Sequence, residues 1–397
     1  MEMRFSRRAS AVKRSFIREI LKVTQRPDII SFAGGLPNPA SFPVADIARA
    51  AQTVLSRDGA AALQYQTTEG FAPLRAWIAE HYNREWNLGV SPAEILVTSG
   101  PQQSIDLLGK VFINAGDRIL LERPSYLGAI QAFQVYEPEL VHVPLSEEGL
   151  DVASLRAALD EAPAKMVYVV PNFQNPSGLS YSEPARRAVC DALRGRDALL
   201  VEDDPYAALR FRGTPLPPLR SYYGAGSVML GTFSKTVSPG IRTGWVCAPP
   251  EIIERLVTLK QAADLHSDAL SQRILHEYLT TSDTAAHIEK IRAMYGRQCD
   301  TMLSAIAEHC PSEVKYTRPE GGMFLWMTLP EGVSSLRLFD RALAVGVAFV
   351  PGIPFYVDGG GDNTLRLNFS NSDEARIREG IERLGKAMRE ELAAPRR

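Results

Sequence analysis

The sequence is poor in cysteine and histidine, and the few that it has are scattered. Cys190, Cys247, Cys299 and Cys310 form no CxxC pair, and the six histidines do not cluster beside them. Zinc sites and disulfide frameworks need closely spaced ligands or paired thiols. We therefore expect no metal and no disulfides, and we interpret the four cysteines as reduced and mostly buried.

The sequence also lacks a strong net charge and a long apolar run. Its 44 Lys and Arg residues almost balance 46 Asp and Glu residues, which leaves a formal charge of -2. That balance creates no field to attract nucleic acid, and no apolar stretch reaches the roughly 18 residues that a membrane span needs. Residues 1–20 are basic but have no apolar core typical of a signal peptide. We expect no nucleic acid or membrane as partner, and a cytoplasmic location.

What the sequence does have is a regular alternation of short apolar runs and helical patterns. A chain of 397 residues with 45% hydrophobic content can form two domains. The apolar runs predicted as strands are 95–98, 118–122, 141–144, 165–171, 198–202 and 228–231. Helical segments lie between most of them, which predicts a mainly parallel sheet between helices.

The second half of the chain has a different pattern. From Pro250 it is largely helical up to about Ala307, and shorter strands follow at 314–317, 323–327, 348–350 and 364–369 before a C-terminal helix. This order predicts a smaller α+β unit. We expect an N-terminal segment (1–45) with a mobile helix that packs on the small domain, a large domain (46–285) and a small domain (286–397).

Polar residues follow three of the predicted strands. Asn175 follows the run 165–171, Asp203 and Tyr206 follow 198–202, and Lys235 follows 228–231. The carboxyl ends of parallel strands meet at one edge of a sheet, where ligands bind. Each motif also fits an ordinary role, since a lysine is usually a surface charge, Asn-Pro-Ser-Gly is a good turn and an aspartate can cap a helix.

The surroundings of Lys235 are typical of a nucleophile beside a phosphate site. Thr232, Ser234 and Arg242 supply hydroxyls and a guanidinium for a phosphate, and Lys235 could form a Schiff base with an aldehyde. The turn Ser99-Gly100-Pro101 precedes a helix that starts near Gln102, and such a helix N-terminus points backbone N–H groups at an anion.

Pyridoxal 5′-phosphate is a ligand that would use all of these groups. Its pyridine nitrogen needs a carboxylate to stay protonated, a role that suits Asp203. Asn175 and Tyr206 would hydrogen-bond the ring oxygen, and Tyr126 could stack on the ring. Arg366 would bind the substrate carboxylate through its two-pronged guanidinium, although an arginine alternating with leucines in a strand is usually solvated.

In this order, the motifs resemble those of the fold-type I aminotransferases of class I/II, over nearly the whole chain. The residues that carry the resemblance are Tyr65, Tyr126, Asn175-Pro176-Ser177-Gly178, Asp203-Asp204-Pro205-Tyr206, Ser234-Lys235, Arg242 and Arg366. The stretches 30–37, 63–65, 261–266 and 316–324 are most similar to the branch of 2-aminoadipate and kynurenine aminotransferases. The resemblance implies a large domain with a mainly parallel seven-stranded sheet, and a smaller α+β domain.

The resemblance also implies further site residues. The phosphate would bind at Gln102 and Gln103 as well, and Tyr65 would come from the neighbouring subunit of a homodimer whose active sites lie at the interface. Gly35 would border the substrate. Ser15 and Arg18 would meet its side chain from the mobile N-terminal helix. One departure is Pro101, where the branch commonly has Ser, because proline offers neither hydroxyl nor N–H.

The function that these resemblances imply is transfer of the amino group of an L-amino acid to a 2-oxo acid such as 2-oxoglutarate, by a ping-pong mechanism. The donor would be 2-aminoadipate or an aromatic or branched-chain amino acid. A second hypothesis is a β-lyase or decarboxylase reaction on the same fold. A third is a non-catalytic binding domain, as in regulators that join a winged helix to such a fold; we expect too few residues before Gly34 for that module.

Overall fold

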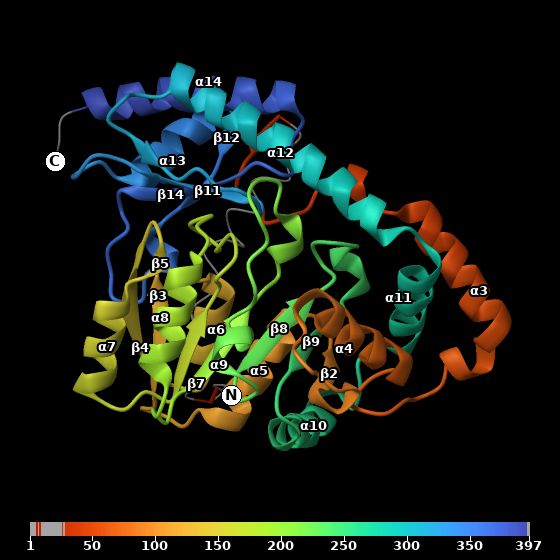
Figure 1. Ribbon diagram of the computed structural model, residues 1–397. Helices are drawn as coiled ribbons and strands as arrows, with labels where there is room; N and C mark the ends of the chain where they lie inside the picture. The colour runs from red at the N-terminus through yellow and green to blue at the C-terminus, as the bar shows by residue number, and fades with distance from the viewer. Residues whose placement is uncertain (1–4, 7, 9–25, 27, 395–397) are drawn as a thin grey trace, which may run out of the picture.

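The computed structural model describes residues 5, 6, 8, 26 and 28–394. Figure 1 shows a large domain built around a central sheet, with a smaller domain covering one end of that sheet. Ser15 and Arg18, with the helix expected around them, lie outside the described residues. The predicted domain boundaries at residues 45 and 285 stay a prediction.

The central sheet is mainly parallel, as predicted. Its strand order is β2-β9-β8-β7-β6-β3-β4-β5. The strands are β2 (Ile95–Thr98), β3 (Arg118–Arg123), β4 (Glu139–Ser146), β5 (Gly149–Leu150), β6 (Met166–Val169), β7 (Leu199–Asp203), β8 (Val228–Thr232) and β9 (Gly244–Cys247). The five strands from β8 to β4 are parallel, whereas β9 is antiparallel to both β2 and β8, and β5 to β4.

The described residues thus give this sheet eight strands, one more than the seven expected. The additional strand at the edge is β5, which has only two residues and turns back onto β4. The sequence reading also missed β9, a four-residue strand that begins with Gly244, a residue that weakens a strand pattern.

Helices cover both faces of this sheet. Along β3, Leu120 belongs to the buried cluster of α7 (Val152–Glu161) and α8 (Glu183–Leu193). Its neighbours Ile119 and Leu121 belong to the cluster of α5 (Pro101–Phe112) and α6 (Leu127–Gln134). Successive side chains of a strand point to opposite faces, so both faces are buried. The other helices of this domain are α3 (Val44–Ala62), α4 (Ala72–Trp86), α9 (Arg220–Tyr223), α10 (Pro250–Asp264) and α11 (Ala269–Thr281).

The long helix α12 (Thr284–His309) leads into the small domain, where it packs against α14 (Glu374–Ala393) (Figure 1). The helical stretch predicted up to Ala307 is divided at Asp283, whose side chain accepts a hydrogen bond from Ala286 N and caps α12. A second sheet has the order β10-β11-β14-β13 and is antiparallel. Its strands are β10 (Lys315–Tyr316), β11 (Phe324–Thr328), β13 (Val350–Pro351) and β14 (Thr364–Asn368), and α13 (Ser335–Ala344) lies beside it.

A two-stranded pair ties the beginning of the described chain to the small domain. The strand β1 (Ile30–Ser31) pairs in parallel with β12 (Val347–Ala348). The predicted strand 348–350 is therefore two short strands, β12 and β13, on either side of Phe349. Short 3₁₀ turns are η1 (Pro39–Ser41), η2 (Pro92–Glu94), η3 (Ala207–Leu209), η4 (Pro239–Ile241) and η5 (Ile353–Phe355). Ser91 and Glu94 form a capping box at η2.

Among residues 28–394, no helix has the length and apolar character needed to cross a membrane. The same part of the chain has no group of three or more His, Cys, Asp or Glu side chains arranged to hold a metal ion. All four cysteines are free thiols; three are buried and Cys310 is half-buried.

A buried arginine holds the loop that leads from β6 towards Asn175. Arg186 on α8 is fully buried, and its guanidinium donates to Tyr181 O, Pro217 O and Pro171 O at 3.0–3.1 Å. It also donates to Asn172 Oδ1 at 2.6 Å. Because a buried charge must be matched by hydrogen bonds, this side chain fixes residues 171–172 against α8.

We expect Arg186→Met to lower the free energy of unfolding by about 3 kcal/mol or more, because buried carbonyl groups lose their donor. Its neighbour provides the control: Arg187 is exposed and pairs with Glu183 at 2.7 Å, so Arg187→Met should cost less than about 1 kcal/mol. Chemical denaturation of both variants measures the difference. Equal small losses would show that the buried network does not stabilise this loop.

Candidate active site

A cavity of about 460 Å³ lies where the carboxyl ends of β6, β7 and β8 meet the small domain. Eleven of the residues predicted for the site line it: Gly35, Gln102, Tyr126, Asn175, Asp203, Tyr206, Thr232, Ser234, Lys235, Arg242 and Arg366. The first and the last of them, Gly35 and Arg366, are more than 300 residues apart in sequence. The fold therefore brings together most of the predicted set.

Two predicted residues that the structure describes are not part of this lining. Tyr65 is 77% exposed, and its ring contacts His266 edge to face at 5.6 Å. Gln103 follows Gln102 on α5, but its side chain hydrogen-bonds Asp264 instead of facing the cavity. Ser15 and Arg18 lie outside the described residues.

Lys235 follows β8 directly, and its ammonium group is held inside the cavity. Nζ donates a hydrogen bond to Gly35 O at 2.9 Å. Burial lowers the pKa of Lys235 to about 8, and the positive charges of Arg366 and Arg242 add to the effect. An amine with this pKa is partly neutral near pH 7 to 8, which is the form that attacks an aldehyde.

Asp203 ends β7 and is only 2% exposed. Its Oδ2 accepts a hydrogen bond from the Tyr168 hydroxyl at 2.5 Å, whereas Oδ1 is buried without a partner among the described residues. Burial raises the pKa of Asp203 to about 7. Such a carboxylate lacks one donor, and a cationic N–H in the cavity would supply it.

Tyr168 is a residue that the sequence reading missed. It lies inside the buried strand β6, in an otherwise apolar run. A buried tyrosine hydroxyl needs a hydrogen-bond partner, so its position in that run was the available signal. The sequence could not show that the partner is Asp203 on the neighbouring strand.

Arg366 on β14 is buried, with 3% of its surface exposed, although an arginine at such a position is usually solvated. It donates to Asn175 Oδ1 at 2.7 Å and to Ala33 O at 2.8 Å, while its Nε has no partner among the described residues. The guanidinium lies over the rings of Phe324 and Phe355, at 4.3 and 5.3 Å from their centroids. Burial lowers the pKa of Arg366 to about 10. These two phenylalanines were also missed.

Two tyrosines complete the walls of the cavity. Tyr206 is buried and packs edge to face against Phe324 at 6.0 Å. Burial raises the pKa of Tyr206 well above its usual range and that of Tyr126 to about 12. Both phenols therefore stay protonated at neutral pH and can donate hydrogen bonds.

Two hydroxyl groups and the positive charge of Arg242 lie in one corner of the cavity. Ser234 N donates to Thr232 Oγ1 at 3.0 Å, and that hydroxyl donates to Ser234 Oγ at 2.9 Å. Arg242 donates to Ser99 O at 3.2 Å, in the turn before α5. Gly100 in this turn has φ +90°, and a Cβ there would lie 2.5 Å from the Arg242 guanidinium. The turn thus approaches Arg242 in a way that only glycine permits.

Comparison with known proteins connects this geometry with a family. The family model for aminotransferase class I and II matches residues 27–384. The chain belongs to the class I and II aminotransferases. Its activity is the transfer of an amino group, and the family's cofactor is pyridoxal 5′-phosphate.

Two relatives are similar over nearly their whole length. The 2-aminoadipate transaminase of Thermus thermophilus is 46% identical over 98% of this chain and 97% of the relative. The aromatic-amino-acid aminotransferase 1 of Thermococcus litoralis is 44% identical over 98% and 95%. Among solved structures, the kynurenine aminotransferase of Pyrococcus horikoshii superposes with a TM-score of 0.95 at 42% identity, over 98% of each chain. The α-aminoadipate aminotransferase of Thermus thermophilus, complexed with N-(5′-phosphopyridoxyl)-L-leucine, gives 0.92 at 45% identity, also over 98% of each chain.

The residues of the aminotransferase cavity fit the cofactor. The unpaired Oδ1 of Asp203 suits a protonated pyridine nitrogen, and the corner beside Arg242 suits a phosphate. Lys235 offers an amine with a lowered pKa for the aldehyde.

We expect the attachment of pyridoxal 5′-phosphate to Lys235 in cofactor-free protein to speed up with rising pH and to level off above about 8, because only the neutral amine reacts. Arg366→Gln should move the midpoint to higher pH, since it removes a charge that lowers the pKa. Borohydride trapping and mass spectrometry measure the rate. Arg187→Met, which removes an exposed charge, should not move it. A wild-type midpoint near 10 would contradict the prediction.

Proposed function

We propose that this aminotransferase takes the amino group from 2-aminoadipate or from an aromatic or branched-chain L-amino acid and gives it to a 2-oxo acid such as 2-oxoglutarate, by a ping-pong mechanism. The names of the relatives support 2-aminoadipate and aromatic donors, and the leucine adduct of the Thermus thermophilus structure supports a branched-chain donor. The observation that carries the proposal is the position of Arg366, a buried guanidinium with an unpaired Nε in the same cavity as Lys235.

The cofactor ring would lie between the large-domain residues of the cavity. Pyridoxal 5′-phosphate, when bound, supplies an electron sink for the electron pair that the amino acid Cα releases on losing its proton. Asp203 would hold the pyridine nitrogen, because its Oδ1 needs a donor. Asn175 and Tyr206 would bind the ring oxygen, and Tyr126 would cover the ring face.

The phosphate would bind in the corner formed by Thr232, Ser234 and Arg242. The N-terminus of α5 adds the N–H of Gln102 and the favourable end of the helix dipole. Pro101 is the first residue of α5 and has no N–H to give. The remaining donors therefore carry the phosphate at this turn.

Lys235 would have two tasks. It would hold the cofactor through the aldehyde carbon, and when free its amine would take the proton from the substrate Cα. A pKa of about 8 suits both tasks near neutral pH. The hydrogen bond to Gly35 O gives the amine a place beside the substrate position.

Arg366 would bind the α-carboxylate of the substrate. Asn175 and Ala33 O already fix the plane of the guanidinium, so little side-chain freedom is lost when a carboxylate binds. The rings of Phe324 and Phe355 beside the guanidinium exclude water and strengthen the ion pair.

A homodimer is the second part of the proposal, with Tyr65 reaching the partner's active site. Tyr65 and Leu63 are 77% and 72% exposed. The Tyr65 ring contacts His266, and Leu265, the residue before His266, is also exposed. Exposed apolar residues grouped in this way are typical of an interface. Tyr65 does not line its own cavity.

We expect the visible band of the bound cofactor to be lost stoichiometrically when the protein is mixed with a substrate amino acid and no 2-oxo acid. Each amino acid of a panel that bleaches the band is a donor, and 2-oxoglutarate should restore the band. Lys235→Ala should show no such cycle. Pyruvate and ammonia accumulating from cysteine-type substrates while the band persists would indicate a lyase instead.

We expect Tyr65→Ala and Lys235→Ala to complement each other. Each variant alone should be nearly inactive, whereas mixed dimers contain one intact site. An equal mixture, after subunit exchange, should recover roughly a quarter of wild-type activity. No recovery, in a mixture that native mass spectrometry shows to contain mixed dimers, would exclude a contribution of Tyr65 across the interface.

A further inference from the structure

Gln103 lies next to the proposed phosphate corner but points away from it. Its amide oxygen accepts a hydrogen bond from Ser99 N at 2.8 Å, and its amide nitrogen donates to Asp264 Oδ2 at 2.7 Å. Both ends of the side chain are therefore used. The bond from Ser99 N links the start of the turn Ser99-Gly100-Pro101 to α5, which follows it, and the bond to Asp264 connects this turn to the end of α10.

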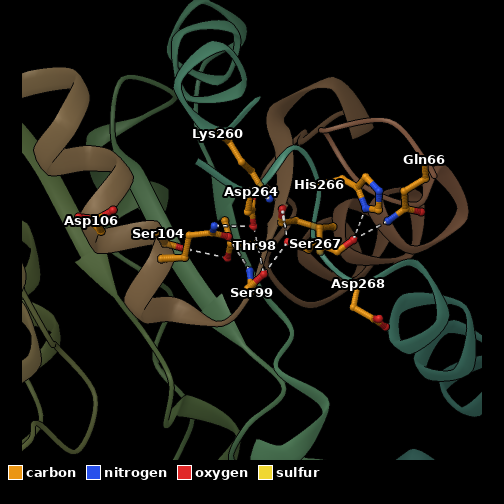
Figure 2. Close-up of polar contacts among 12 residues, drawn as sticks. Gln66, Thr98, Ser99, Ser104, Asp106, Lys260, Asp264, His266, Ser267 and Asp268 are labelled. Carbon is orange, nitrogen blue, oxygen red and sulfur yellow. Dashed lines mark hydrogen bonds and ion pairs between the residues drawn. The ribbon is translucent and has the colours of Figure 1, made fainter. Parts of the chain in front are cut away.

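Asp264 is itself fixed by a buried lysine. Lys260 lies one turn earlier on α10, has no exposed surface, and donates from Nζ to Asp264 Oδ1 at 2.6 Å. In Figure 2, Asp264 lies between Lys260 and Ser99, at the point where α10 meets the β2–α5 turn. A buried ammonium is costly unless paired, so Lys260 holds the Asp264 carboxylate in one place.

The turn is held from its other side by the site itself. Ser99 O accepts from Arg242, while Ser99 N is bound by Gln103, so both backbone polar groups of Ser99 are fixed. The Ser99 hydroxyl donates to Ser267 Oγ at 3.2 Å (Figure 2). Gly100 packs against the Arg242 guanidinium. A shift of the turn would therefore move Arg242 and the start of α5 together.

We propose that Gln103 and Asp264 are positioning residues for the cofactor phosphate: they clamp the turn before α5 so that its N–H groups and Arg242 face the phosphate. This inference rests on the proposed phosphate site. It gives Gln103 a role that needs no contact with the cofactor. It also compensates for Pro101, because a turn that lacks one N–H donor binds a phosphate more tightly when its other donors are already fixed in place.

The test compares two probes, pyridoxal 5′-phosphate and pyridoxal, which lacks the phosphate. Dissociation constants come from equilibrium dialysis of the full-length protein. Gln103→Glu removes the donor to Asp264 and places two carboxylates together, while Lys260 keeps its partner. When Asp264→Asn is added, the amide nitrogen at position 264 can donate to the carboxylate at position 103. The double variant therefore restores the hydrogen bond with donor and acceptor exchanged.

We expect Gln103→Glu to weaken binding of pyridoxal 5′-phosphate on the order of tenfold and to leave binding of pyridoxal unchanged. The Gln103→Glu, Asp264→Asn double variant should recover most of the loss. The control is Lys110→Met, which breaks the ion pair of Lys110 with Asp106 on the same helix α5. It should change neither constant.

Equal weakening for both probes, or no recovery in the double variant, would overturn the positioning role. Arg242→Gln separates this failure from a failure of the phosphate site. If Arg242→Gln weakens pyridoxal 5′-phosphate selectively and Gln103→Glu does not, only the present inference is wrong. If Arg242→Gln has no selective effect, the proposed phosphate site is wrong, and the inference falls with it.

Discussion

The burial of unlike charges in one cavity is the constraint on which the rest of the structure depends. Asp203 and Arg366 are buried and Lys235 is half-buried, and for each one burial favours the neutral form: the pKa of Asp203 rises, and those of Lys235 and Arg366 fall. Their own partners match them only in part, because Asp203 Oδ1 and Arg366 Nε stay unpaired among the described residues. A cavity of this kind is preorganised for charged ligands at a cost in stability.

One wall behind the cavity is held by a buried, hydrogen-bonded carboxylate. Glu122 at the end of β3 is buried and accepts hydrogen bonds from Val170 N, Tyr181 and Gln174. Gln174 also donates to Pro124 O, so one side chain connects the loop before Tyr126 with the loop of Asn175. Burial raises the pKa of Glu122 to about 7, and its three donors hold it in place. This network therefore fixes the two loops that carry Tyr126 and Asn175 into the cavity.

The sequence predicted most of the residues that line the cavity because these residues follow strands of a parallel sheet, whose carboxyl ends meet at one edge. Asn175, Asp203 and Lys235 each follow a short apolar run, and parallel pairing alone brings them together. The prediction failed where a role depends on a contact between distant segments. Tyr168 could be recognised as needing a partner but not as bonded to Asp203, and Gln103 appeared to be a ligand of the phosphate because only the tertiary structure places Asp264 beside it. The antiparallel β9 was missed because it is short and begins with a glycine, which weakens the strand pattern.

Arg366 shows why the position of the small domain matters to the chemistry. The residue belongs to β14, yet its guanidinium binds Asn175 of the large domain and the carbonyl of Ala33, close to β1. Three separate parts of the chain therefore meet at one planar group with donors in fixed directions. A lysine has no such plane and could satisfy Asn175 or Ala33 only by giving up orientation toward a carboxylate. The geometry of the proposed carboxylate site is consequently set by the packing between the domains as well as by the residues that line the cavity.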